Sequence, residues 1–366
     1  MVNRRSSVTR KFGILTAGGD CPGLNAAIRG VCRAAQGRYG MTVVGISDGF
    51  RGVIEENVRV LEPADFSGIL TRGGTILGTS REKPFKSEIT LSDEIVGEKV
   101  TAVKETYRKL GLDCLVVLGG NGTNTTGYRF AREGLNVIGL PKTIDNDIVG
   151  TDRTFGFHSA LSICTEAIDR LHTTAQSHNR VMVLELMGNK AGWLSLYAGV
   201  AGGGDVILIP EIPYDVKAIA RHLEARTKFG KSFSIIVVAE GALSVREAEM
   251  DKRDRKKYRA DNGPSVGYRV AREIHGETGL ETRATVLGYV QRGGIPSASD
   301  RVFATSLGTA AADLLAKGEY GRMVALRNGV IDSVDLSVPA GHVRTVPEDH
   351  YMVDTAIAVG TCMGRD

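Results

Sequence analysis

The sequence predicts an α/β protein with two similar lobes, each built on a mainly parallel, doubly wound sheet. Two observations favour this fold class: four short runs are rich in Val, Ile and Leu, and a glycine-containing turn follows each run. Continuous apolar runs are typical of strands buried on both faces of a parallel sheet. Helical patterns after the turns indicate strand–helix alternation, and in such sheets ligands bind beyond the carboxyl ends of the strands.

The predicted strands come in two pairs along the chain. The runs and the turns that follow them are 12–17 with 18–20, 114–118 with 119–122, 181–187 with 188, and 233–240 with 241. Helical stretches are expected at 25–35 and 125–133. The two pairs predict two lobes with a cleft between them, and a length of 366 residues also favours two domains.

Composition excludes several classes of protein. A net charge of +4 is too diffuse to indicate nucleic-acid binding, although it suits an anionic substrate. No apolar run approaches the ~20 residues of a membrane span. The five cysteines are odd in number and show no C-x-x-C spacing, so we expect neither a disulfide framework nor a zinc site. A reducing cytoplasm fits this cysteine usage.

Two glycine turns are candidate phosphate sites. In 18–25 and 119–123, backbone N–H groups and the positive end of the next helix can cradle a phosphate, and Thr123 can donate to an oxygen. Each turn alone is equally consistent with a tight connection that binds nothing. Neither turn matches the P-loop or the dinucleotide-binding pattern, so these two classes are disfavoured.

The segment 141–147 is the most informative. Asp145 and Asp147 are spaced i and i+2, and in an extended or irregular segment such side chains face the same side. One can act as a base toward a sugar hydroxyl while the other helps to hold a metal ion. Lys142 supplies a cation beside donor phosphates. The alternative is an acidic turn stabilised by its own hydrogen bonds.

The chain resembles the phosphofructokinase family over nearly its whole length. The matching stretches are LTAGGDCPGLNAAIRG, TRGGTILGTSR, VVLGGNGT, GLPKTIDNDIVGTDRTFGF, AIDRLHTTAQSHNRVMVLELMG, LIPE, GLETRATVLGYVQRGG and SASDR. The resemblance implies two Rossmann-like lobes per subunit, with the active site in the cleft between them. It also implies a homotetramer, a dimer of dimers whose active sites are completed across a subunit interface. The expected lobes are 1–156 plus about 293–340 for the phosphoryl donor, and 157–292 plus about 341–366 for the sugar phosphate.

The resemblance also implies roles for single residues. The phosphoryl-donor site would comprise Gly18, Arg81, Gly119, Asn121, Gly122 and Thr123. The catalytic group would comprise Arg81, Lys142, Thr143 and Asp145, with Asp145 as the base. The sugar phosphate would contact Thr143, Asp145, Asp147, Arg180, Met187, Gly188, Glu240, Arg283, Tyr289 and Arg292. Among these, Arg180, Arg283 and Arg292 match cations that hold the 6-phosphate, two of them typically lent by the neighbouring subunit. Tyr289 stands where many members have His.

Two departures from the family pattern concern the donor and the metal ion. Lys142 resembles the pyrophosphate-dependent branch, whereas Gly122 keeps open the space that a nucleotide needs, so we favour ATP over pyrophosphate. Asn121 stands where most members have Asp, and a neutral amide binds Mg²⁺ less well than a carboxylate. Asp147 and donor phosphates would then help Asn121 to hold Mg²⁺.

The predicted activity is that of a cytoplasmic, glycolytic 6-phosphofructokinase, which uses MgATP to convert fructose 6-phosphate into fructose 1,6-bisphosphate. Three alternatives stay open: a pyrophosphate-dependent enzyme, a non-catalytic regulatory paralogue that binds sugar phosphates, and a kinase of another sugar such as sedoheptulose 7-phosphate. Arg29, Arg33 and Asp205 match effector-binding positions of regulated members, but helix-surface charge explains the two arginines equally well. The charged stretch 246–259 is interpreted as a solvated helix or loop, and the chain from Leu326 as support for the lobes.

Overall fold

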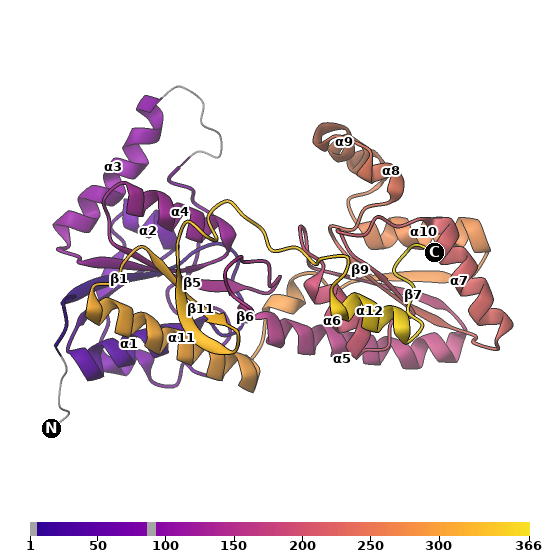
Figure 1. The fold of residues 1–366 in the computed structure, drawn as a ribbon, viewed down its shortest axis with the longest axis horizontal. Helices are drawn as coiled ribbons and strands as arrows, with labels where there is room; N and C mark the ends of the chain where they lie inside the picture. The colour runs from indigo at the N-terminus through magenta and orange to yellow at the C-terminus, as the bar shows by residue number, and fades with distance from the viewer. Residues whose placement is uncertain (1–5, 86–92) are drawn as a thin grey trace. The chain divides into compact units, whose positions relative to one another are not determined.

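The computed structural model describes residues 6–85 and 93–366 and divides into two compact units. Unit 1 consists of Met1–Ile144, Ile148–Ser159 and Arg292–Val343, and unit 2 consists of Asp145–Asp147, Ala160–Gln291 and Arg344–Asp366. Helix α5 (Phe157–His178) begins in unit 1 and continues in unit 2 (Figure 1). Each unit is therefore assembled from pieces that are distant in sequence.

Unit 1 contains an 8-stranded sheet in the order β12-β11-β5-β4-β1-β2-β3, with β6 paired to β5. The strands are β1 (Lys11–Thr16), β2 (Thr42–Ile46), β3 (Val58–Val60), β4 (Cys114–Gly119), β5 (Val137–Thr143), β6 (Phe155–Gly156), β11 (Arg322–Arg327) and β12 (Val330–Asp335). The central strands run parallel, whereas β3 and β12 are antiparallel to their neighbours at the two edges. All six residues of β4 are buried, as expected for the middle of a sheet covered on both faces.

Helices cover both faces of this sheet (Figure 1). They are α1 (Leu24–Tyr39), α2 (Gly49–Ile54), a 3₁₀ turn (Pro63–Phe66), α3 (Asp93–Lys109), α4 (Asn121–Arg132) and α11 (Ala298–Lys317). On one face α1 and α11 pack backbone to backbone at two glycines. A Cβ atom at Gly30 would lie 2.7 Å from the carbonyl oxygen of Thr305, and one at Gly308 would lie 2.6 Å from that of Ala27.

Unit 2 contains a 4-stranded parallel sheet in the order β10-β7-β9-β8. Its strands are β7 (Val181–Leu186), β8 (Val206–Leu208), β9 (Ser234–Ala239) and β10 (Thr282–Val286). The helices are α6 (Trp193–Ala201), α7 (Val216–Lys228), α8 (Val245–Ala248), α9 (Lys252–Asn262), α10 (Val266–Thr278), a 3₁₀ turn (Gly288–Arg292) that reaches the unit boundary, and α12 (Tyr351–Ala358). Alternate residues of β7, β8 and β9 pack with α7 and α10 in one hydrophobic cluster, so strand periodicity builds the core of this unit.

The predicted fold class is confirmed. The four predicted strands correspond to β1, β4, β7 and β9, and the members of each pair are parallel neighbours in one sheet. The expected helices at 25–35 and 125–133 correspond to α1 and α4, although α4 begins at Asn121, directly after the glycine turn. The two sheets differ in size, because β2, β3, β5, β11 and β12 extend the sheet of unit 1.

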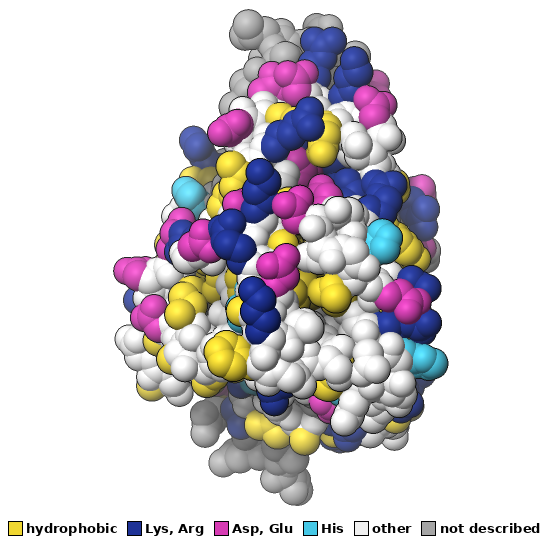
Figure 2. Space-filling view, turned by 90° about the vertical axis from the view of Figure 1, so that its right-hand side faces the viewer, with side chains coloured by type: hydrophobic (Ala, Val, Ile, Leu, Met, Phe, Trp, Pro, Cys, Tyr) yellow, Lys and Arg dark blue, Asp and Glu magenta, His cyan; other side chains and the backbone are white. Residues whose placement is uncertain are grey.

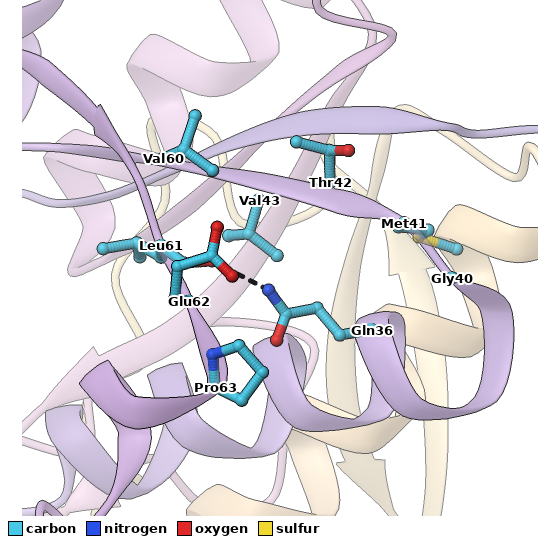
Figure 3. Close-up of a pocket in the computed structure, with 9 residues that line it drawn as sticks. All are labelled: Gln36, Gly40, Met41, Thr42, Val43, Val60, Leu61, Glu62 and Pro63. Atoms are coloured by element: carbon cyan, nitrogen blue, oxygen red, sulfur yellow. Dashed lines mark hydrogen bonds between the residues drawn. The ribbon is translucent and has the colours of Figure 1, made fainter. Parts of the chain in front are cut away.

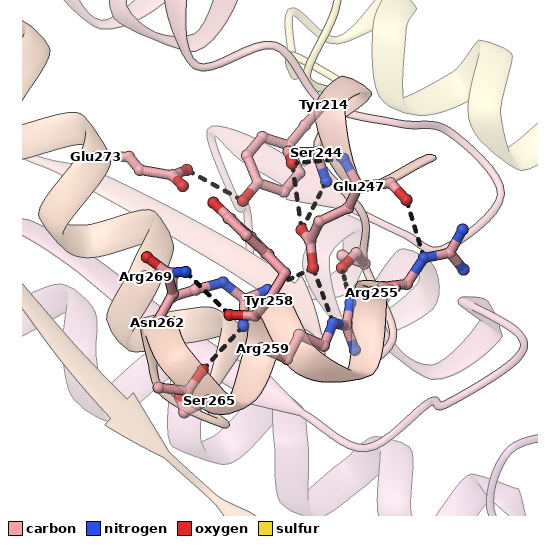
Figure 4. Close-up of polar contacts among 12 residues, drawn as sticks. Tyr214, Ser244, Glu247, Arg255, Tyr258, Arg259, Asn262, Ser265, Arg269 and Glu273 are labelled. Carbon is pink, nitrogen blue, oxygen red and sulfur yellow. Dashed lines mark hydrogen bonds and ion pairs between the residues drawn. The ribbon is translucent and has the colours of Figure 1, made fainter. Parts of the chain in front are cut away.

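The charged stretch 246–259 is helical and largely exposed, but it is anchored by a buried carboxylate (Figure 4). Glu247 is 0 % exposed, and its Oε1 accepts hydrogen bonds from Arg259 at 2.8 Å and from Arg269 at 3.0 Å. Burial acts to raise the pKa of Glu247, but hydrogen bonds from Ser244 and Arg259 and the charge of Arg269 outweigh it, so the pKa lies below its usual value. The prediction of a solvated helix or loop describes most of this stretch, but it did not include the buried anchor at Glu247.

The face of the molecule drawn in Figure 2 carries Lys and Arg interspersed with Asp and Glu, and its hydrophobic side chains form only small groups. No helix in residues 6–85 and 93–366 has the length and apolar character needed to cross a membrane. All five cysteines are free: Cys21, Cys32, Cys114 and Cys164 are buried, and Cys362 is half-buried.

Candidate active site

The two glycine turns of unit 1 lie at the same edge of its sheet. They follow β1 and β4, which are parallel neighbours, so their carboxyl ends lie side by side. The N–H of Ala17 donates to the carbonyl oxygen of Leu118 at 3.0 Å, and the N–H of Gly18 donates to Ser80 at 2.9 Å. These bonds fix the first turn against the end of β4 and against the loop that carries Arg81.

Both turns lead into helices that begin without a side-chain cap. Gly23, with φ 104°, precedes α1, and Gly120 precedes α4; neither helix has a side-chain cap or an acidic residue in its first turn. The N–H groups at a helix start lack partners within the helix and carry partial positive charge, so they favour phosphate. In the part of the chain that the structure describes, no atom outside the neighbouring backbone of α4 lies within 4 Å of the position of a Cβ at Gly122.

Three polar side chains gather around the first turn. The Nζ of Lys142, which is only 4 % exposed, donates to the carbonyl oxygen of Gly19. A Cβ at Gly18 would lie 3.8 Å from Thr123 Oγ1 and 3.9 Å from Lys142 Nζ. A Cβ at Gly19 would lie 1.9 Å from a terminal nitrogen of Arg292, so the guanidinium group packs directly on this glycine. The structure thus brings together residues expected at the donor site and one expected at the sugar 6-phosphate.

The acidic segment is divided between the units. Thr143 ends β5 in unit 1, where its carbonyl oxygen accepts a hydrogen bond from Thr154 Oγ1 at 2.8 Å, and Asp145–Asp147 belong to unit 2. Asn146 has φ 53°, in the left-handed region. The segment is therefore not an extended strand, and the i, i+2 alternation of a strand does not explain where Asp145 and Asp147 point.

In unit 2, Met187, Gly188 and Glu240 meet at the carboxyl ends of β7 and β9. The N–H of Glu240 donates to Leu186 at 2.8 Å, and the N–H of Gly241 donates to Gly188 at 3.1 Å. The buried side chain of Gln291 joins this group: its Oε1 accepts from the N–H of Met187 at 3.0 Å, and its Nε2 donates to Gly288 at 2.9 Å. Gln291 was not among the predicted site residues, although it lies in the matching stretch GLETRATVLGYVQRGG.

Arg180 and Arg283 lie at the opposite end of the same sheet. Arg180 directly precedes β7, and Arg283 pairs in register with Met182, near the start of that strand. Both guanidinium groups contact Glu281, Arg180 at 2.8 Å and Arg283 at 2.6 Å. Within unit 2 the structure does not bring these arginines to Met187, since the length of β7, roughly 20 Å for six residues, separates them.

The remaining predicted residues lie on the surface or in structural contacts. Arg81 and Tyr289 are exposed, and Arg29 and Arg33 lie one turn apart on α1. Asp205 pairs with Arg226 at 2.6 Å and accepts from the N–H of Ile235 at 2.9 Å. Burial raises the pKa of Asp205, and the contacts with Ile235 and Arg226 partly oppose that rise. Asp205 thus has a structural explanation as well as the predicted effector role.

The predicted metal ligands offer only oxygen atoms. Asn121 begins α4 with an amide oxygen, and Asp147 supplies a carboxylate. Among the described residues, no three His, Cys, Asp or Glu side chains come together in an arrangement that could hold a metal ion. An amide oxygen and a carboxylate are each a kind of ligand that fits Mg²⁺, which is usually held by one or two protein groups together with substrate phosphates and water.

A pocket of about 240 Å³ lies elsewhere in unit 1, between the end of α1 and the strands β2 and β3 (Figure 3). Its lining includes Gln36, whose Nε2 donates to the carbonyl oxygen of Leu61 at 2.8 Å. None of the predicted site residues lines this pocket, so it is not part of the candidate active site.

Comparisons with known proteins identify the family to which the chain belongs. A family model described as Phosphofructokinase matches residues 11–315. A protein of Spirochaeta thermophila named ATP-dependent 6-phosphofructokinase is 65% identical over 97% of this chain and 98% of its own length. One of Bacteroides thetaiotaomicron, named ATP-dependent 6-phosphofructokinase 3, is 51% identical over 97% and 100%. The solved phosphofructokinase of Pichia pastoris is 32% identical with a TM-score of 0.77, and the match covers 93% of this chain but 38% of the yeast chain.

Proposed function

Because this chain belongs to the phosphofructokinase family, we propose that it is an ATP-dependent 6-phosphofructokinase. It transfers the γ-phosphoryl group of MgATP to the 1-hydroxyl of fructose 6-phosphate and releases fructose 1,6-bisphosphate and ADP. The observation that carries the proposal is the edge of unit 1 where two glycine turns, two uncapped helix starts and Lys142 meet. We further propose that the enzyme acts in glycolysis in the cytoplasm. It would be a homo-oligomer that assembles as a dimer of dimers.

The chemistry needs a positioned hydroxyl and neutralised charge. Asp145 takes the proton of the 1-hydroxyl while the O1–Pγ bond forms and the bond from Pγ to the β,γ-bridging oxygen breaks. Lys142, Thr123 and the N–H groups at the start of α4 stabilise charge on the donor phosphates. Mg²⁺, held by Asp147, Asn121 and those phosphates, would supply further neutralisation of that charge.

The sugar phosphate is assigned to the remaining predicted residues. Glu240, Met187 and Gly188 bind the sugar ring, and Thr143 contacts it beside the base. Arg292 holds the 6-phosphate, together with Arg180 and Arg283 supplied by a neighbouring subunit. Their place at the far end of β7 supports this sharing, because one chain cannot bring them to its own Met187.

A coupled assay tests the proposal. Purified protein with Mg²⁺ is given fructose 6-phosphate or sedoheptulose 7-phosphate and, in separate reactions, ATP or pyrophosphate, and the formation of the bisphosphate is followed. Turnover with ATP is expected, and Asp145→Ser should lower kcat by ~10² to 10⁴, the usual contribution of a general base. Turnover with pyrophosphate alone, binding without turnover, or higher kcat/KM for sedoheptulose 7-phosphate would each replace the proposal with the corresponding alternative.

A further inference from the structure

The C-terminal segment of unit 2 begins beside the acidic segment. The N–H of Arg344 donates to the carbonyl oxygen of Asp147 at 2.8 Å, and a terminal nitrogen of its guanidinium group donates to the carbonyl oxygen of Asn146 at 3.3 Å. One residue thus holds two successive peptide groups of the segment that carries Asp145. It does so across 198 positions of sequence.

Arg344 is itself fixed by a buried aromatic residue. Its guanidinium carbon lies 4.4 Å from the centre of the Trp193 ring, and Trp193 Nε1 donates to the carbonyl oxygen of Arg344 at 2.9 Å. Trp193 is 2 % exposed and begins α6. A cation over an indole ring is stabilised by the charge distribution of the ring, and most strongly when water is excluded.

Glu211 connects the backbone beside Trp193 with the backbone beside Arg344. Its carboxylate accepts from the N–H of Gly192, directly before Trp193, at 3.0 Å and from the N–H of Val346, two residues after Arg344, at 2.8 Å. Burial raises the pKa of Glu211, and these N–H groups partly oppose that rise. Arg344 and Trp193 are therefore tied together at their side chains and through neighbouring backbone groups.

The backbone conformation of the acidic segment also bears on this support. Asn146 has φ 53°, a left-handed conformation that Asn adopts more readily than most non-glycine residues but still at some cost in energy. Arg344 donates to the carbonyl group of this residue and to that of the next.

We infer that Arg344 is a positioning residue for phosphoryl transfer: it holds the backbone of Asp145–Asp147 in the conformation that aims the base. This inference rests on the proposed function, in which Asp145 takes the proton of the sugar hydroxyl. Arg344 touches neither substrate nor reacting atoms in this role. It acts through Asp145, and its loss lowers kcat because a small displacement of a catalytic group slows the reaction strongly.

Arg344→Met removes the guanidinium group and keeps a long side chain on Trp193. We expect kcat to fall by ~10²-fold, the effect of a displacement of about 1 Å, while KM for ATP changes little. The matched control is Arg365→Met in the same segment, since Arg365 forms an exposed ion pair with Glu348 at 2.8 Å. It should keep the kcat of the unmodified chain. Wild-type kcat in folded Arg344→Met protein contradicts the inference.

A double-mutant cycle separates positioning from a general loss of structure. If Arg344 acts by positioning Asp145, its loss has no further effect once the Asp145 carboxylate is absent. The double variant Asp145→Ser, Arg344→Met should then be as slow as Asp145→Ser alone. Losses that multiply contradict the inference. If Asp145→Ser alone keeps full activity, the proposed base is wrong instead. Should Arg344→Met fail to fold, Arg344→Lys, which keeps a cation over Trp193, takes its place in the cycle.

Discussion

We expect Gly122 to decide which donor the start of α4 accepts. Among the described residues, no atom outside the neighbouring backbone of α4 lies within 4 Å of a Cβ built there, which is consistent with room for a nucleotide. Gly122→Asp adds a carboxylate beside the donor phosphates, and an unfavourable like charge shielded from water costs several kcal/mol. We expect kcat/KM for ATP to fall by ~10²-fold or more, whereas Gly122→Ala should stay close to wild type. Steady-state kinetics at varied ATP check this, and equal effects of both substitutions would contradict it.

The absence of a side chain at Gly19 allows the guanidinium group of Arg292 to pack there, because a Cβ atom at that position would overlap it. Gly19→Ala moves a flexible side-chain end, so we expect little loss of stability. The proposed contact between Arg292 and the 6-phosphate should weaken, and a charge-assisted hydrogen bond contributes about 1.5–3 kcal/mol. KM for fructose 6-phosphate should therefore rise by ~10-fold or more. Gly37→Ala, with open space around the added Cβ, is the control; an unchanged KM would contradict the role assigned to Arg292.

At the scale of single residues, the sequence identifies groups whose chemistry is local and misses those that act through long-range contacts. Lys142 and Thr123 stand beside glycine turns, so their gathering follows from adjacent parallel strands. Arg344 lies in a weakly patterned segment, and its partners Trp193 and Asn146 are 151 and 198 positions away. No periodicity or spacing contains that information.

At the scale of elements, the anchor of α8 and α9 gives a stability prediction. Glu247→Gln leaves the buried Arg269 without its carboxylate, and breaking a buried ion pair by removing one partner costs about 3–5 kcal/mol. Urea unfolding monitored by circular dichroism measures this loss, and the exposed Glu249→Gln serves as control. A loss no greater than that of the control would mean that the ion pairs contribute no net stability.

The same anchor has a pH dependence with a defined sign. The pKa of Glu247 is lowered in the folded protein, so its contribution is fully present above the usual value of 4.5 and is lost as pH falls through the folded pKa. The difference in unfolding free energy between wild type and Glu247→Gln should therefore shrink below pH 4.5. A difference that stays constant down to acid unfolding would contradict the assignment of a charged Glu247.

Strands could be predicted where they are central and buried, and not at the sheet edges. β4 and β9 are continuous apolar runs, which the sequence shows directly. β12 alternates apolar and polar residues without a continuous apolar run and is half-exposed, and β3 is only three residues long. Pairing with a neighbour, rather than their own residues, makes these segments strands.

At the scale of the whole molecule, the C-terminal residues complete unit 2. The backbone of Cys362 forms an isolated parallel β-bridge with Val206. The side chains of Val353 and Met363 are 1 % and 2 % exposed. Truncation after Val343 should therefore abolish the hydrogen-exchange protection of β8 while β4 of unit 1 keeps its protection. Mass spectrometry of peptides from both units checks this. Arg365 and Asp366 form only surface ion pairs, with Glu348 and Arg221 respectively. Removal of these two residues alone should therefore change the protection of neither unit.

The cysteines, all without a disulfide, give the protein a practical use as a spectroscopic reporter. Burial raises the pKa of all five thiols, that of Cys21 to about 12. Cys362 differs from the other four because it is only half-buried. Maleimides attack thiolates that solvent can reach, so we expect Cys362 to react first. A single dye attached there, with no engineered mutation, would report how the end of the chain moves while Arg344, in the same segment, supports catalysis.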